Sequence, residues 1–166
     1  MPSSKHGFRE MGRELVFLSL YIYDLSRVSP AELSGFEWYD IMAGERAEEW
    51  AGEDFLFIPV KRRAEIYEFG KELLNGTISN LNKIDEIINT HLVKWSFNRL
   101  HSVDKAILRL SVYSIIYRYD IPAEVTISEA NDLSNNYSDE NTSNYINGIL
   151  HKVKQEYRKN TLAENS

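Results

Sequence analysis

The sequence predicts an all-α protein, and three observations favour this class. Apolar residues recur every three or four positions in several separate segments, which is the spacing of one face of an α-helix. Helix-start and helix-stop signals stand beside these segments, as in Ser29-Pro30-Ala31-Glu32. The short apolar run at residues 55–58 has no second segment to pair with, so we expect an extended connection there rather than a sheet strand.

The N-terminal half is expected to hold three helical segments. Residues 7–26 form the first, with apolar side chains along one face. The second begins after Ser29, which completes a capping box with Glu32. Residues 61–91 keep helical spacing and form one long or kinked helix.

The C-terminal half is expected to hold three more. Ser102 caps a helix over residues 103–119. Pro122 stops this helix, because proline cannot continue the hydrogen-bond ladder. A capping box at residues 126–129 opens the next helix, and the last one carries an apolar stripe over residues 145–153.

The charge of the chain is unevenly distributed. Its formal net charge is -6, which argues against a general nucleic-acid binder with a strongly basic surface. Residues 1–60 carry 5 basic and 11 acidic side chains, whereas residues 61–166 carry 14 of each. Because the acidic excess is concentrated between Glu32 and Asp54, a basic patch can exist elsewhere.

Composition also bears on compartment and chemistry. With 166 residues, 43% of them hydrophobic, and no cysteine, the chain is expected to fold as one domain in the reducing cytoplasm. The apolar stretch Leu15–Tyr23 is shorter than the ~20 residues of a membrane span, so we expect a buried helix and no membrane partner. Neither the glycines nor the histidines form a phosphate-binding or metal-ligand motif. We therefore expect no cofactor and no enzymatic activity.

Several motifs occur together in the C-terminal half. They are Trp95, Arg99-Leu100, Val103–Leu110, Ile121-Pro122, Ile127–Ala130 and Tyr145–Leu150. In order and spacing they closely resemble the NusB family of transcription antitermination factors. The N-terminal helix matches more weakly, and residues 27–60 show little correspondence.

The resemblance implies a fold of two packed three-helix subdomains, a NusB-like helical bundle. On this basis residues 7–157 form a single NusB-like domain with an acidic insert at about 27–60. Residues 1–6 are expected to be a disordered tail and residues 158–166 a loose one.

The resemblance also implies a function. Members of this family bind the boxA-type RNA of rRNA transcripts as a heterodimer with NusE, which is also a small-subunit ribosomal protein. In this way they act on the transcription elongation complex. Two alternatives stay open: a protein-interaction bundle with little RNA binding of its own, and a fragment of an rRNA cytosine methyltransferase, some of which carry a NusB-like domain.

Three arginines are RNA-binding candidates. Arg9 and Arg13 match the family's basic opening helix and lie one turn apart, so both can follow one phosphate strand. The alternative is a solvated helix face. Arg109 either contacts RNA or, as we favour, ties the two subdomains together through a carboxylate.

Three further candidates surround the start of the last helix. Tyr145 occupies the family's phenylalanine position, where its ring either stacks on an unpaired base or belongs to the core. Asn141 and Asn144 stand where relatives often carry aspartate and lysine. Replacing one negative and one positive side chain by amides leaves the local net charge unchanged. We therefore expect the specificity for RNA to be altered while the affinity is kept.

Two positions match the family's partner-facing residues, Tyr21 and Asp104. Asp104 also lies in the first turn of its helix, where a carboxylate can satisfy backbone N–H groups. Both roles can hold together.

Overall fold

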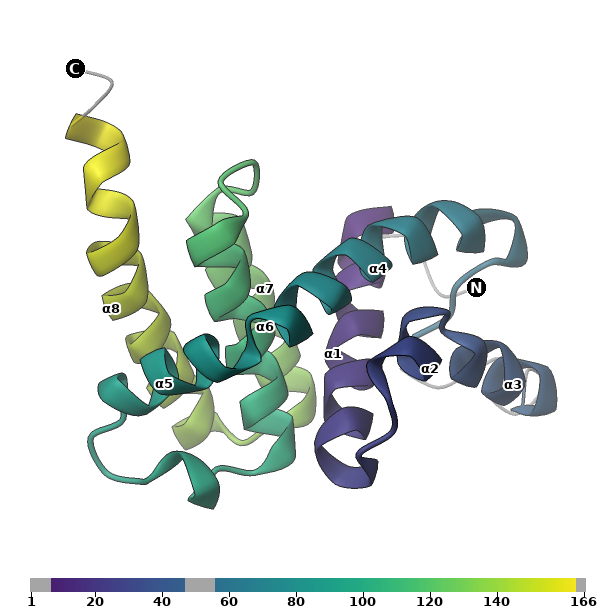
Figure 1. Ribbon diagram of the computed structural model, residues 1–166, viewed down its shortest axis with the longest axis horizontal. Helices are drawn as coiled ribbons and strands as arrows, with labels where there is room; N and C mark the ends of the chain where they lie inside the picture. Colours follow the sequence, from purple (N-terminus) through teal and green to yellow (C-terminus); the bar gives the residue numbers. More distant parts are fainter. Residues whose placement is uncertain (1–6, 47–55, 164–166) are drawn as a thin grey trace. The chain divides into compact units, whose positions relative to one another are not determined.

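The computed structural model describes residues 7–46 and 56–163 and consists of helices joined by short connections (Figure 1). These residues contain eight α-helices, two 3-10 helices and no strand, so the predicted all-α class is confirmed. The chain divides into two compact units, residues 1–75 and residues 76–166.

The first unit begins with helix α1 (Phe8–Ser26), as the apolar spacing predicted. Its stripe is buried, and the side chains of Leu15, Val16 and Leu20 have no exposed surface. The helix ends at Arg27, whose φ of 58° lies in the left-handed region that terminates many helices.

The insert of the first unit is partly helical. It contains α2 (Pro30–Ser34), α3 (Glu37–Arg46) and the 3-10 helix η1 (Val60–Arg62). The predicted capping box is present, because Ser29 and Glu32 exchange side-chain to backbone hydrogen bonds of 3.1 and 3.3 Å. Residues 56–59 are extended, as predicted. The expected tail at residues 1–6 and most of the acidic run lie outside the described residues.

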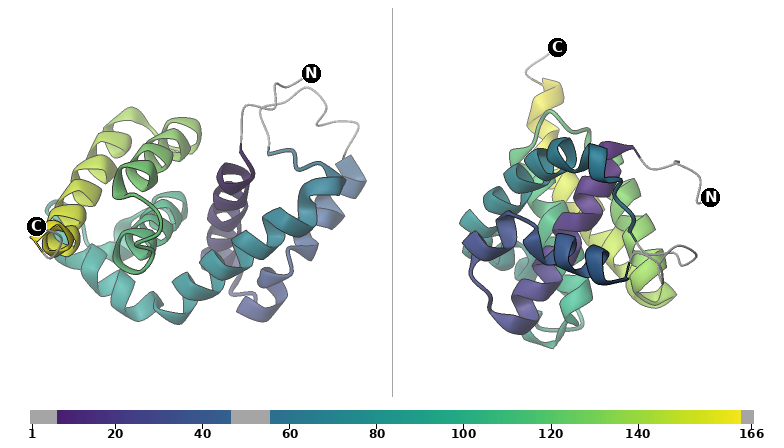
Figure 2. Two further views of the ribbon diagram at one scale, coloured as in Figure 1. Left: turned by 90° about the horizontal axis from the view of Figure 1, so that it is seen from above. Right: turned by 90° about the vertical axis from the view of Figure 1, so that its right-hand side faces the viewer.

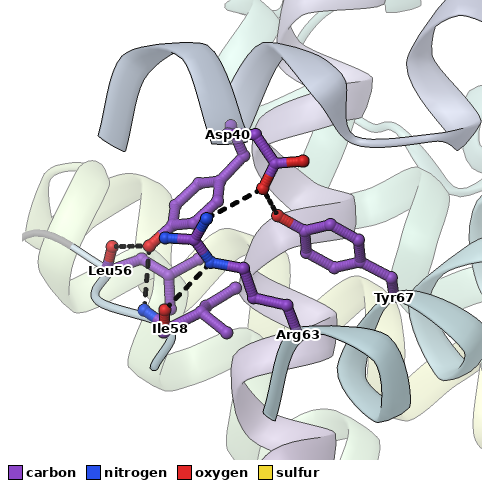
Figure 3. A network of polar contacts seen from close by, with 6 residues as sticks. Asp40, Leu56, Ile58, Arg63 and Tyr67 are labelled. Carbon is purple, nitrogen blue, oxygen red and sulfur yellow. Dashed lines mark hydrogen bonds and ion pairs between the residues drawn. The ribbon is translucent and has the colours of Figure 1, made fainter. Parts of the chain in front are cut away.

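A polar network holds the connection between α3 and the next α-helix, α4 (Arg63–Ser79) (Figure 3). The buried Tyr39 hydroxyl donates to the Leu56 carbonyl at 2.9 Å and accepts from the Ile58 N–H at 2.8 Å. Arg63 donates to the Ile58 carbonyl and to Asp40, and Asp40 also accepts from a tyrosine hydroxyl on α4. The connection is therefore fixed through its backbone, which no hydrophobic pattern in the sequence could indicate.

Two consecutive helices, α4 (Arg63–Ser79) and α5 (Leu81–His91), replace the predicted long or kinked helix. The break falls at Asn80, whose side-chain amide donates to the Gly76 carbonyl at 2.8 Å and so competes with the helical ladder. Gly76 must be glycine, because a Cβ there would lie 1.9 Å from the Tyr113 hydroxyl.

Helices α6 (Ser102–Tyr117), α7 (Ala123–Tyr137) and α8 (Glu140–Ala163) pack on one another in the second unit (Figure 2), and α5 also contacts α6 and α8. The predicted starts of α6 and α7 were wrong. The α6 cap is His101 rather than Ser102, and α7 begins directly after Pro122 rather than at the capping box of residues 126–129. The Pro122 carbonyl accepts the Val125 and Thr126 N–H groups, so Pro122 begins α7, whereas α6 already ends at Tyr117.

Helix α8 continues to Ala163, into the segment that was predicted to be a loose tail after Tyr157. The Arg158 guanidinium donates to four backbone carbonyls at the end of α6 and in the turn that follows it, those of Ser114, Ile115, Arg118 and Ile121. It also lies over the Tyr119 ring, with Cζ 4.6 Å from the ring centre. These bonds connect α8 to the end of α6, where helix carbonyls commonly accept hydrogen bonds from outside the helix, and so they stabilise α8 beyond Tyr157.

We predict that Tyr39→Phe destabilises the protein by about 1–3 kcal/mol, because it leaves two buried backbone groups without their hydroxyl partner. Urea unfolding followed by circular dichroism measures the loss. Tyr67→Phe is the matched control: its hydroxyl bonds the exposed Asp40 carboxylate, so a smaller loss is expected. Equal losses in the two variants would contradict this account of the network.

We also predict that Arg158→Lys lowers the stability by about 1.5–3 kcal/mol, because an ammonium cannot serve four carbonyls arranged around a planar guanidinium. Thermal unfolding measures the change. Lys152→Gln, on an exposed position of the same helix, should leave the melting temperature nearly unchanged. A lysine variant as stable as the parent protein would show that the bonds of Arg158 are dispensable.

Candidate functional site

The two arginines of α1 do not form a shared phosphate-binding face. Arg9 is exposed, whereas Arg13 is 7% exposed. The Arg13 guanidinium lies 5.6 Å from the centre of the Phe69 ring, within the range of a cation–π contact. One of the two predicted phosphate contacts is therefore placed in the interior, and Arg9 is the one available to a ligand.

Arg109 makes a contact with a carboxylate. Its Nε and Nη2 donate to the two carboxylate oxygens of Asp85 at 2.8 and 2.9 Å, and the residue is 5% exposed. Both residues belong to the second unit, so this ion pair lies within that unit. A buried guanidinium engaged in a bidentate ion pair has little access to a phosphate.

Asn141 and Asn144 lie together on the first turns of α8, and both are exposed. Asp139 precedes them and accepts the Thr142 N–H at 2.8 Å. This backbone hydrogen bond lowers the pKa of Asp139 below its ordinary value. The start of α8 therefore presents two neutral amides beside an ionised cap.

Tyr145 is neither fully exposed nor part of the buried core. Its ring is half-buried, and its hydroxyl accepts the Val93 N–H at 3.1 Å. The Trp95 ring stands against it with 5.1 Å between ring centres and an angle of 73° between ring planes. In the sequence, Trp95 served only as one of the motifs that indicate the family, and it was not predicted to be a site residue. The signal that could have found it is an aromatic residue between Lys94 and Arg99.

Asp104 is joined to the turn that precedes α8. The residue is 3% exposed, and its Oδ1 accepts the Ser138 hydroxyl at 2.8 Å. Burial raises the pKa of Asp104, although the Ser138 hydrogen bond acts in the opposite direction. Tyr21 is half-buried on α1 and belongs to the other unit.

The described residues contain neither a metal-binding cluster nor a helix suited to span a membrane. No group of three or more histidine, aspartate or glutamate side chains in residues 7–46 and 56–163 is placed to hold a metal ion. Within the same residues, no helix has the length and apolar character needed to cross a membrane.

Comparison with known proteins identifies the family. The model of the NusB family matches residues 13–155. The NusB antitermination protein of Treponema denticola is 35% identical over 88% of this chain and 95% of its own length. That of Thermodesulfovibrio yellowstonii is 41% identical, but the alignment covers 58% of this chain and 64% of the relative, which is less than two thirds.

A solved structure gives a similar result. The antitermination factors NusB and NusE in complex with double-stranded RNA contain a chain that superposes with a TM-score of 0.70 at 28% identity. The superposition covers 90% of this chain and 98% of that one. The family model extends over all six sequence motifs, the structural match covers 90% of the chain, and the chain belongs to the NusB family of transcription antitermination proteins.

Proposed function

We propose that this protein is an RNA-binding transcription antitermination factor without enzymatic activity, acting in the cytoplasm. It binds boxA-type RNA of rRNA transcripts as a heterodimer with the ribosomal protein NusE, within the transcription elongation complex. The observation that carries this proposal is the likeness to a NusB–NusE–RNA complex over 90% of the chain.

The charge distribution supports the need for a partner. Of the three candidate arginines, Arg13 and Arg109 are buried, and the amides of Asn141 and Asn144 add no positive charge. Affinity for RNA rises with the number of phosphates that a protein neutralises. A surface with few available cations therefore binds RNA weakly until a second protein adds its own contacts.

The geometry around Asp104 supports a link between the two ligands. Asp104 matches a partner-facing position, and its hydrogen bond to Ser138 joins it to the turn before α8. Asn141 and Asn144, the candidate RNA residues, follow that turn directly. A partner that engages α6 near Asp104 would thus rest against the segment that positions the RNA contacts. Binding of each ligand would then favour the other by the same factor.

A second candidate function is a protein-interaction bundle with little RNA binding of its own. It is favoured by the acidic excess of residues 1–60 and by the burial of Arg13. The alternative differs from the main proposal in one measurable property, which is RNA retention in the presence of NusE.

We predict that labelled boxA-type RNA binds the protein–NusE mixture more tightly than the protein alone in fluorescence anisotropy titrations. Arg9→Gln should weaken this binding and reduce the slope of log K against log salt by about 0.7–0.9, the value of one phosphate contact. Lys71→Gln, an exposed cation of the same unit, is the control and should leave the slope unchanged. Absence of RNA retention even with NusE present would refute the main proposal and support the interaction bundle.

We predict that Asp104→Asn keeps the fold and weakens RNA binding only when NusE is present. The amide preserves the shape and can still accept the Ser138 hydrogen bond, but it removes the charge that the partner would recognise. Folding raises the pKa of Asp104, so deprotonation of this carboxyl group is less favourable in the folded protein than in the unfolded chain. The free energy of unfolding therefore falls as the pH rises from the ordinary carboxyl range through the raised pKa. The variant should therefore be at least as stable as the parent at neutral pH.

Equilibrium unfolding between pH 3 and 7 tests the stability part of this prediction. RNA titrations with and without NusE test the binding part. An equal loss of RNA affinity in both titrations would show that Asp104 does not act through the partner.

A further inference from the structure

The connection between α5 and the 3-10 helix η2 (Phe97–Arg99) exposes a tryptophan. Trp95 is 44% exposed, and Val93 beside it is 78% exposed. An indole ring has a large apolar face whose burial against a ligand is strongly favourable. The contacts described so far assign no role to the exposed part of this ring.

The backbone on both sides of Trp95 is held in place. On one side the Val93 N–H donates to the Tyr145 hydroxyl at 3.1 Å, and on the other the Phe97 N–H donates to the Asn89 side-chain oxygen at 3.3 Å. The Phe97 ring also has the Lys105 Nζ 5.1 Å from its centre. A ligand that covers Trp95 therefore meets a loop that has already lost most of its conformational freedom, which lowers the entropic cost of binding.

The ring contact of Trp95 leaves room for a flat ligand. Its ring meets the Tyr145 ring in a T-shaped arrangement, with an interplanar angle of 73°. In such an arrangement the tyrosine can cover at most one face of the indole. The tyrosine thus fixes the ring from one side, and the exposed part of the indole is available for stacking.

The charge near Trp95 is positive although the chain is acidic. Residues 91–105 contain three basic side chains, Lys94, Arg99 and Lys105, and one acidic side chain, Asp104. Asp104 is buried, whereas Lys94 and Arg99 are exposed. An exposed aromatic ring between exposed cations is the arrangement that binds single-stranded nucleic acid, because the cations attract phosphates and the ring stacks on a base.

We propose that Trp95 stacks on an unpaired base of the bound RNA, next to the strand that reaches Tyr145. This inference rests on the proposed RNA-binding function and adds a second aromatic contact to it. The positive charge favours RNA as the ligand over a hydrophobic protein surface. Stacking on the indole would be tolerant of base identity, since every base has an aromatic face.

The test uses the full chain with saturating NusE and single-stranded boxA-type RNA, followed by fluorescence anisotropy. Trp95→Leu should lower RNA affinity by roughly 5- to 150-fold, the range that corresponds to the loss of one stacked base. Because a stacking contact is not electrostatic, the slope of log K against log salt should not change. Trp95→Phe keeps an aromatic ring and should lose less, and Tyr119→Leu, another exposed aromatic of the same unit, should bind like the parent.

A second series replaces each RNA nucleotide in turn by an abasic one. At the position that stacks on Trp95, the parent and Trp95→Leu should bind the abasic RNA equally well. The inference would be overturned if Trp95→Leu bound the RNA more weakly than the parent at every abasic position. It would also be overturned if the variant bound intact RNA as tightly as the parent. So would a similar loss of NusE affinity measured without RNA, since Trp95 would then be a protein contact. Failure of the parent itself to bind RNA would instead refute the proposed function.

Discussion

Helix α6 is surrounded by other helices on nearly all sides, and the second unit is organised by this burial. Twelve of its 16 residues are buried, and they include an aspartate and an arginine as well as aliphatic side chains. Charged groups in such a place require partners, because an unpaired buried charge costs several kcal/mol. Asp85 on α5 pairs with Arg109, Ser138 bonds Asp104, and Arg158 on α8 satisfies the carbonyls at the end of the helix. These contacts fix the elements around α6 more specifically than apolar packing alone.

The candidate RNA-binding region follows from the same arrangement. Helix α8 begins at the turn that Asp104 holds through Ser138. Its first turns carry the exposed amides and Tyr145, whose hydroxyl in turn holds the loop of Trp95. Asp104, for which we propose a role in partner binding, is therefore connected through hydrogen bonds to the start of α8 and to the Tyr145–Trp95 pair within one unit. This continuity gives a physical reason for two ligands to influence each other's binding.

Residues 27–60, which we expected to form an acidic insert, show a different kind of organisation. The part of them that the structure describes contains the helices α2 and α3 and a fixed connection. The Tyr39 hydroxyl and the Arg63 guanidinium bind the backbone of this connection from both sides. Asp40, one of the acidic side chains of this segment, belongs to the same network through its ion pair with Arg63.

The sequence by itself determined the helical class, the place of most helices, and the family, because apolar spacing and the motifs around residues 91–130 are local features. It also placed three candidate residues, Tyr145 and the two asparagines, at the start of the last helix, where the structure has them. It did not determine which arginines are exposed: Arg9, Arg13 and Arg109 look alike in sequence, and their burial depends on side chains such as Phe69 and Asp85. Nor did it identify Trp95 as a neighbour of Tyr145. Such facts depend on contacts between residues far apart in the chain, and only the tertiary structure decides them.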